Sequence, residues 1–161
     1  MPLASPQAIR PNLGIYATEQ EALDGVVARL VEALDPQAIW LFGSRARGDH
    51  RPDSDFDLLV VAKQGQAWAN DYRAVLRPLH ETSLGCDVVP CSGADFEEGL
   101  TLHTSLISQI VLHDCCLYNG DRHSQIPHPE LVEGCSSLPR LRRLALRQAQ
   151  GEGLRVSQST Q

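Results

Sequence analysis

The sequence of 161 residues lacks any uninterrupted apolar run close to the ~18 residues that a membrane-spanning helix requires. Its first seventeen residues also lack the basic start and the apolar segment of a secretory signal, and they carry three prolines. The hydrophobic share of 42% and the charged share of 21% are close to the averages of globular proteins. We therefore expect a soluble, cytoplasmic protein with one ordinary domain and no membrane partner.

Paired metal ligands and a disulfide framework are also missing. The cysteines are odd in number and contain no C-x-x-C pair; they are Cys86, Cys91, Cys115, Cys116 and Cys135. Structural zinc sites take Cys or His ligands at short fixed spacings, which these cysteines and the six histidines do not supply. The sequence therefore predicts reduced thiols and disfavours a zinc site.

Basic residues are scarce in most of the chain. Residues 1–120 contain 16 acidic and 8 basic residues, a balance of −8, whereas residues 121–161 contain 4 and 6, a balance of +2. Non-specific affinity for nucleic acids comes mainly from Lys and Arg side chains that neutralise phosphates. We therefore expect no stable binding of DNA or RNA.

Helical and extended patterns alternate along the first 120 residues. Apolar residues recur with helical spacing after Thr18, which forms a candidate capping box with Glu21. Trp68 and Tyr72 have helical spacing too and are expected to pack in the core. The expected helices are residues 18–34, 68–79 and 95–112, and the expected strands are residues 38–42, 55–62, 85–90 and 115–118. This alternation predicts an α/β (α+β) fold, a small mixed β-sheet flanked by helices.

The chain is expected to divide into three parts. Residues 1–17 form an N-terminal loop segment, residues 18–120 form the folded domain, and residues 121–161 form a disordered C-terminal tail without a strand pattern. Leucines at helical spacing between Leu138 and Gln150 leave open a helix that docks on a partner. Two tail segments, HPELVEG and LRQAQGE, resemble peptides translated from dispersed repeats of bacterial genomes. An accidental extension is the other interpretation of the tail.

The stretch GSRARGDHRPDSDFD, from Gly43 to Asp57, carries the most informative chemistry. It is not a Walker A loop, because neither of its glycines precedes a lysine. It is not a calcium-binding EF-hand loop from Asp53 either, because the sixth position of that loop is glycine and here is Leu58. The arrangement that remains is a strand, followed by a Gly-Ser turn and a returning strand that carries paired aspartates.

Three aspartates are candidate metal ligands. In an extended strand Asp55 and Asp57 point to the same face, ~7 Å apart along the chain. If the strand that Asp87 begins pairs beside them, its carboxylate joins that face. Such an oxygen site suits Mg²⁺, which adds water and substrate phosphates to few protein carboxylates, and it predicts nucleoside triphosphate chemistry. The alternatives are surface carboxylates in a turn for Asp55 and Asp57, and a turn cap for Asp87.

The Gly-Ser turn is a candidate phosphate site. Gly43 has no side chain to obstruct a phosphate, Ser44 adds a hydroxyl donor, and the amides of Ser44 and Arg45 open a predicted helical turn toward the same anion. Arg45, Arg47 and Arg51 supply positive charge to a site that is otherwise acidic. The spacing leaves open which arginine contacts phosphate.

Gly43-Ser44, a ten-residue gap, Asp55-Phe56-Asp57 and the later Asp87 together resemble the nucleotidyltransferase superfamily that includes DNA polymerase beta and kanamycin nucleotidyltransferase. The form GSRARGDHRPDSDFDLLVV and the small size are most similar to its minimal nucleotidyltransferase (MNT) branch, over about residues 18–120. The resemblance implies a polymerase beta-like fold. It also implies that Gly43 and Ser44 hold the triphosphate, and that Asp55, Asp57 and Asp87 ligate two Mg²⁺ ions as catalytic residues.

The resemblance also implies a partner and a reaction. MNT proteins pair with helical HEPN proteins, often toxin ribonucleases, so we expect an antitoxin that transfers AMP from ATP to a tyrosine of such a toxin. One alternative is a non-catalytic antitoxin that neutralises its partner by binding. Another is an aminoglycoside adenylyltransferase that builds its acceptor pocket across a homodimer.

Overall fold

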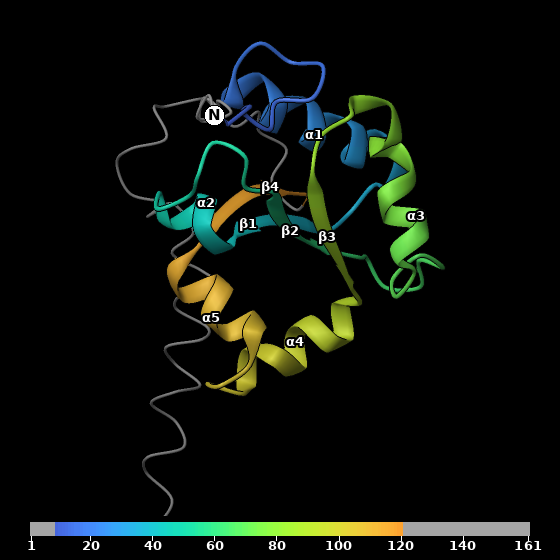
Figure 1. Cartoon of the computed structure of the whole chain (residues 1–161). Coiled ribbons are helices and arrows are strands. Elements are labelled where there is room, and N and C mark those ends of the chain that lie inside the picture. Colours follow the sequence, from blue (N-terminus) through green and yellow to red (C-terminus); the bar gives the residue numbers. More distant parts are fainter. Residues whose placement is uncertain (1–8, 121–161) are drawn as a thin grey trace, which may run out of the picture.

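The computed structural model describes residues 9–120, which form a four-stranded sheet with helices on both faces (Figure 1). The strands lie in the order β3-β2-β1-β4. Within this range the strands are β1 (Ala38–Phe42), β2 (Phe56–Val61), β3 (Cys86–Cys91) and β4 (Cys115–Asn119). The helices are α1 (Glu19–Leu34), α2 (Gly43–Arg47), α3 (Tyr72–Leu76), α4 (Gly93–Thr101) and α5 (Leu106–His113), and a 3-10 turn spans Arg77–Thr82.

The sheet is mixed, as the sequence predicts. β1 lies between two antiparallel neighbours, β2 and β4, whereas β2 and β3 run parallel. The pairing of β1 with β4 contains an irregularity between Ile39 and Trp40. All four predicted strands are present, and the α/β class of the fold is confirmed.

β2 is apolar along most of its length because both of its faces are covered. Phe56, Leu58 and Val60 face the layer that contains α1 and α3, whereas Leu59 and Val61 face the layer that contains α4 and α5. Figure 1 shows these two layers on opposite sides of the sheet. The central strand is therefore fixed from both sides, and the polar residues that precede it are held at one end of the sheet.

Thr18 caps α1 as the sequence predicts, but the second bond of the expected capping box involves Ala17 instead of Thr18. Thr18 Oγ1 accepts a hydrogen bond from the amide of Glu21 at 3.1 Å, and Glu21 Oε2 accepts one from the amide of Ala17 at 3.1 Å. The helix ends before Asp35, which adopts a φ of 44°. The apolar side of α1 is buried against the sheet.

The predicted second helix is shorter than its apolar spacing suggests. α3 begins only at Tyr72, where Asp71 caps it, and Pro78 lies in the 3-10 turn that follows. Trp68 lies before the helix, packs on the core and donates its indole N–H to the carbonyl of Leu34 at 3.1 Å. Tyr72 is 55% exposed, so the prediction that it packs in the core is wrong. Because Trp68 is not helical, the four-residue spacing does not place the two rings on one face.

The predicted helical stretch at residues 95–112 is two helices. Ser92 caps α4 and Ser105 caps α5, each by accepting a backbone N–H at 3.0 Å. Ser105 also donates to the carbonyl of Gly99 in α4, which closes the turn between the helices. The side chains of Leu102 and Leu106 are exposed at this turn.

No helix within residues 9–120 combines the length and the apolar character that a membrane span requires. The expected tail, including the candidate helix from Leu138 to Gln150, lies outside the described residues.

We expect Leu58→Ala to lower the free energy of unfolding by about 2–5 kcal/mol, because Leu58 is fully buried and its truncation leaves a cavity in the central strand. Urea denaturation measures this loss. The matched control is Leu102→Ala, which removes the same atoms from a side chain that is 54% exposed and should change the value by less than about 0.5 kcal/mol. Equal losses in the two variants would contradict the assignment of the core.

Candidate functional site

The starts of β2 and β3 bring two of the predicted aspartates together. Asp57 and Asp87 are direct partners in the parallel pairing, so their side chains share one face of the sheet. On its other side Asp57 pairs with Phe42, the last residue of β1. Asp87 is exposed and Asp57 is half-buried. The third strand does pair beside the second, which is the arrangement that the sequence analysis required.

Asp55 lies one residue before β2, and its carboxylate occupies the space beside Gly85. A Cβ atom on Gly85 would collide with Asp55 Oδ1. Asp55 and Asp57 are therefore near the same end of the sheet, but the Asp55 carboxylate is directed to the residue before β3.

Burial and negative charge raise the pKa of Asp57 above its ordinary value. Burial is the largest cause, and the charges of Asp87 and Asp55 follow; Arg47 and Arg45 oppose them. Among residues 9–120, no ion pair involves any of the three aspartates. The site therefore carries an excess of negative charge that a bound cation would relieve.

Gly43 lies directly against Asp57. It opens α2 immediately after β1 with a φ of 74°, a conformation that glycine adopts readily. A Cβ atom there would collide with Asp57 Oδ2. The predicted helical turn at Gly43-Ser44 is present, and the glycine lets this turn approach the carboxylate.

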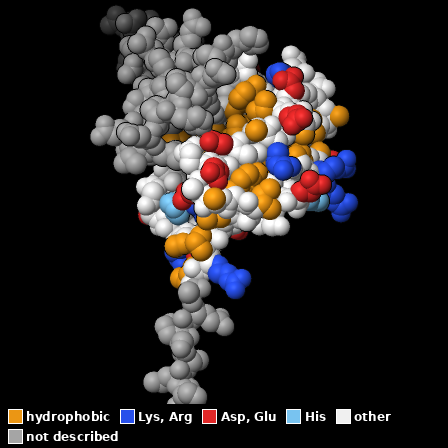
Figure 2. Space-filling view, turned by 90° about the horizontal axis from the view of Figure 1, so that it is seen from above, with side chains coloured by type: hydrophobic (Ala, Val, Ile, Leu, Met, Phe, Trp, Pro, Cys, Tyr) orange, Lys and Arg blue, Asp and Glu red, His pale blue; other side chains and the backbone are white. Residues whose placement is uncertain are grey.

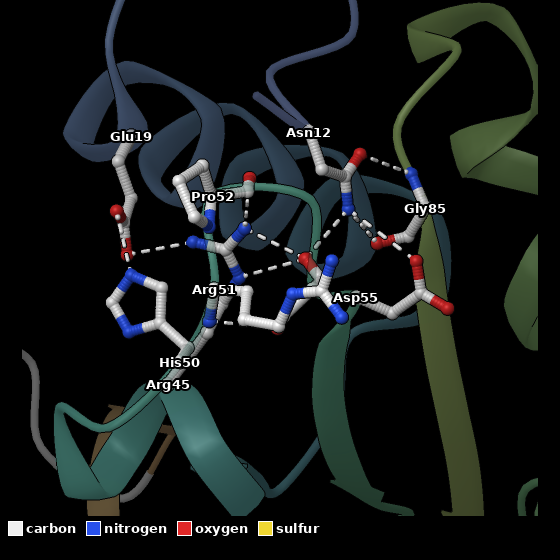
Figure 3. A network of polar contacts seen from close by, with 9 residues as sticks. Asn12, Glu19, Arg45, His50, Arg51, Pro52, Asp55 and Gly85 are labelled. Carbon is white, nitrogen blue, oxygen red and sulfur yellow. Dashed lines mark hydrogen bonds and ion pairs between the residues drawn. The ribbon is translucent and has the colours of Figure 1, made fainter. Parts of the chain in front are cut away.

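Arg45 points toward Glu19 and the loop before β2 (Figure 3). Its side chain is 2% exposed and forms an ion pair with Glu19 at 2.9 Å. It donates to the carbonyl of Ser54 at 2.7 and 3.1 Å and to that of Pro52 at 3.4 Å. Its guanidinium also lies 3.9 Å from the centre of the Phe56 ring. Arg45, one of the three arginines expected to supply positive charge to the site, therefore anchors the loop before β2 to α1.

Arg47 is the more accessible of the two arginines of α2. Its side chain is 57% exposed and pairs with Asp49 at 3.3 Å. Surface pairs of this kind are weak, so little free energy opposes a competing anion. Unlike the buried Arg45, Arg47 is therefore free to turn toward a phosphate; Arg51, which is 70% exposed and pairs with Asp53 at 3.3 Å, is accessible in the same way.

Two functional neighbours were not predicted from the sequence. Glu19 accepts from both Arg45 and His50, the latter at 3.3 Å. Asn12, in the loop before α1, contacts Ser54, Asp55 and Gly85 (Figure 3). No local sequence pattern predicts the roles of Glu19 and Asn12, because each residue that they contact here lies at least 26 positions away along the chain.

A search of protein-family models matches residues 23–113 of this chain to the nucleotidyltransferase domain. The chain belongs to this family. The matched range contains the Gly43-Ser44 turn and all three aspartates, Asp55, Asp57 and Asp87. The nucleotidyltransferase fold predicted from the sequence is confirmed.

One solved structure similar to this nucleotidyltransferase domain is a crystal structure of a protein from Sulfolobus solfataricus that is also described as a nucleotidyltransferase. The two sequences are 25% identical, the match covers 47% of this chain and 69% of the other, and the TM-score is 0.37. No curated protein matches the chain.

Members of this family use a divalent metal ion and a nucleoside triphosphate. Within residues 9–120 no three Asp, Glu, His or Cys side chains are gathered into a group that holds a metal ion by itself. Mg²⁺ does not require such a group, because one or two carboxylates suffice when water and substrate phosphates complete its octahedron. Asp57 and Asp87, adjacent on one face and without a paired cation, fit this donor set.

We expect Asp57→Asn to raise the melting temperature of the metal-free protein at about pH 7, since the variant removes a charge that folding disfavours. The folded pKa of Asp57 is above the unfolded value, so the ionised group opposes folding above the folded pKa, and this effect vanishes below the unfolded pKa. The gain should therefore disappear at about pH 3. Calorimetry in EDTA at both pH values measures it.

The control is Asp53→Asn, because Asp53 lies in the loop just before β2 but pairs with Arg51 at 3.3 Å on the surface. It should change the melting temperature little at either pH. A lower melting temperature for Asp57→Asn at neutral pH would show that this carboxylate stabilises the fold instead.

Proposed function

We propose that this nucleotidyltransferase domain transfers AMP from ATP to a protein acceptor, a tyrosine of a helical HEPN toxin, and acts as its antitoxin. The observation that carries the nucleotide half of the proposal is the position of Asp57, between its strand partner Asp87 and the close approach of Gly43. The partner half rests on the resemblance of the stretch from Gly43 to Val61 to the MNT branch.

Each residue around Asp57 has a proposed role in binding the nucleotide and its metal ion. Gly43 and Ser44 lie at the turn beside Asp57, where a phosphate meets backbone amides and a hydroxyl without a side chain in the way. Arg47 adds a positive charge at the end of α2. Asp57 and Asp87 would hold Mg²⁺, with Asp55 at the margin of the same site.

The reaction is an in-line displacement at the α-phosphorus of ATP. The tyrosine oxygen forms a bond to that phosphorus, the bond to the oxygen that bridges the α- and β-phosphates breaks, and pyrophosphate leaves with the electron pair. Mg²⁺ held by the aspartates would supply Lewis acidity to the α-phosphate and to the leaving group. In this proposal Asp87, whose carboxylate is exposed, receives the hydroxyl proton of an acceptor that approaches from solvent.

A protein acceptor suits the open construction of this site. Within residues 9–120 the helices and strands form the sheet and the two layers that pack on it. No further element in this range is left to enclose a small acceptor molecule. Acidic and basic side chains are also interspersed on the face seen in Figure 2, without a broad basic surface for nucleic acid. A folded partner would supply the missing wall.

We expect co-incubation with the HEPN partner, ATP and Mg²⁺ to add one or more adenylyl units to the partner, measured as intact mass. The double variant Asp55→Asn/Asp57→Asn should lower the rate at least about 100-fold, because loss of the metal site removes several kcal/mol of transition-state stabilisation. The control is Asp53→Asn, which removes a surface carboxylate from the loop before β2 and should retain the rate.

The alternatives give other results. A stable complex without a mass gain would favour an antitoxin that acts by binding alone. Transfer of AMP to an aminoglycoside by the purified protein would favour the homodimeric antibiotic-modifying enzyme. An equal rate for the aspartate double variant would reject the site itself.

A further inference from the structure

Asn12 joins the starts of the two strands that carry the aspartates. Its side-chain N–H group donates to the carbonyl of Ser54 at 3.0 Å and to the carbonyl of Gly85 at 2.9 Å. Its side-chain oxygen accepts from the amide of Gly85 at 2.8 Å, and its own backbone amide donates to Pro52 at 2.8 Å. Figure 3 shows this amide between the loop before β2 and the residue before β3.

The Asn12 side chain replaces a backbone rung of the sheet. The parallel ladder starts with the amide of Phe56 donating to the carbonyl of Gly85 at 3.0 Å. One step earlier the two chains no longer pair with each other, and the carboxamide of Asn12, which has the donor and acceptor of a peptide group, bridges them. The separation of the two strand starts is therefore set by a residue from a third segment.

This bridge also bounds the space of the Asp55 carboxylate. Asn12 Nδ2 lies 3.5 Å from Asp55 Oδ1, a long contact that is secondary to its two carbonyl bonds. On the other side Gly85 leaves room for the carboxylate, since a Cβ atom there would collide with Asp55 Oδ1 and lie 2.8 Å from Asn12 Nδ2. Asp55 thus lies in a niche formed by the amide of Asn12 and the bare Cα of Gly85.

We propose that Asn12 is a positioning residue for the divalent cation of this site: it fixes the separation between Asp55 and the strand of Asp87 and holds the Asp55 carboxylate in place. This inference rests on the proposed nucleotide site but not on the identity of the acceptor. It also gives the loop before α1 a role in function, because the loop supplies the only side chain among the described residues that hydrogen-bonds both strand starts.

The test measures binding of Mn²⁺, as a probe for Mg²⁺, in the presence of an ATP analogue whose α–β bridge is a methylene group. We expect Asn12→Ala to weaken Mn²⁺ binding by about 10- to 100-fold, the usual effect of losing a partner that orients a metal ligand. In an Asp55→Asn background the same substitution should have little further effect, because Asn12 acts through Asp55.

Gln66→Ala is the matched control for a purely structural role. The carboxamide of Gln66 also bridges backbone groups, donating to Leu34 and Asp35 at 2.9 and 3.1 Å and accepting from Lys63 at 2.8 Å. It lies after the opposite end of β2. This variant should lose a similar amount of stability while Mn²⁺ binding is unchanged.

Gly85→Ala is the second variant, in case Asn12→Ala does not fold. The new methyl group displaces the end of the Asp55 side chain and leaves Asn12 in the chain, so it too should weaken Mn²⁺ binding. Unchanged binding in a folded Asn12→Ala, or in Gly85→Ala if the former does not fold, would overturn the proposal. A wild-type protein that binds neither the metal nor the analogue would instead reject the nucleotide site, and the inference with it.

Discussion

Asp57 and Asp87 repel each other, and the pairing of β2 with β3 holds them side by side nonetheless. Each large apolar side chain that β2 buries contributes about 1.5–3 kcal/mol. Two charges 4 Å apart interact by about 1 kcal/mol in water and about 4 kcal/mol near a protein surface. Because β2 buries apolar side chains on both faces, the free energy gained from their burial exceeds the electrostatic repulsion between the aspartates at its polar end. The sheet therefore fixes the register, and the register assembles the acidic site.

The loop between α2 and β2 is fixed by a buried charge. Residues 48–55 contain no helix or strand, yet Arg45 binds their carbonyls at Pro52 and Ser54 and ties them to Glu19 of α1. A buried guanidinium is costly unless it is paired and its donors are satisfied, and here both conditions are met. Arg45 thus holds in place the segment that delivers Asp55.

The sequence predicts the parts of the structure whose causes are local. The N-cap at Thr18, the strand at 38–42 and the apolar strand that begins at Phe56 are confirmed because each depends on neighbours within a few residues. The nucleotide motif is local in the same sense, since Gly43 to Asp57 is one continuous segment: the short helix α2, the loop after it and the start of β2. The assignment of its residues to metal and phosphate remains a prediction.

The features that the sequence did not predict depend on distant contacts. Arg45 turns inward because Glu19 and the carbonyls of the following loop converge on it, and its type alone suits a phosphate equally well. Asn12 bridges Ser54 and Gly85, which lie 42 and 73 positions away. Tyr72 is exposed because Asp71 begins the helix there, a capping choice that competes with apolar spacing.

The raised pKa of Asp57 also bears on whether this protein is an enzyme or a module that acts by binding alone. Neutralising a partner by occlusion requires a complementary surface, and that surface gains nothing from a half-buried aspartate that two like charges oppose. The ionised carboxylate does not stabilise the fold either, because Asp57 makes no ion pair within the described residues. In the proposed reaction a bound cation would relieve this repulsion and so gain binding free energy from it. The raised pKa of Asp57 therefore favours the proposed nucleotide chemistry over a module that acts by binding alone.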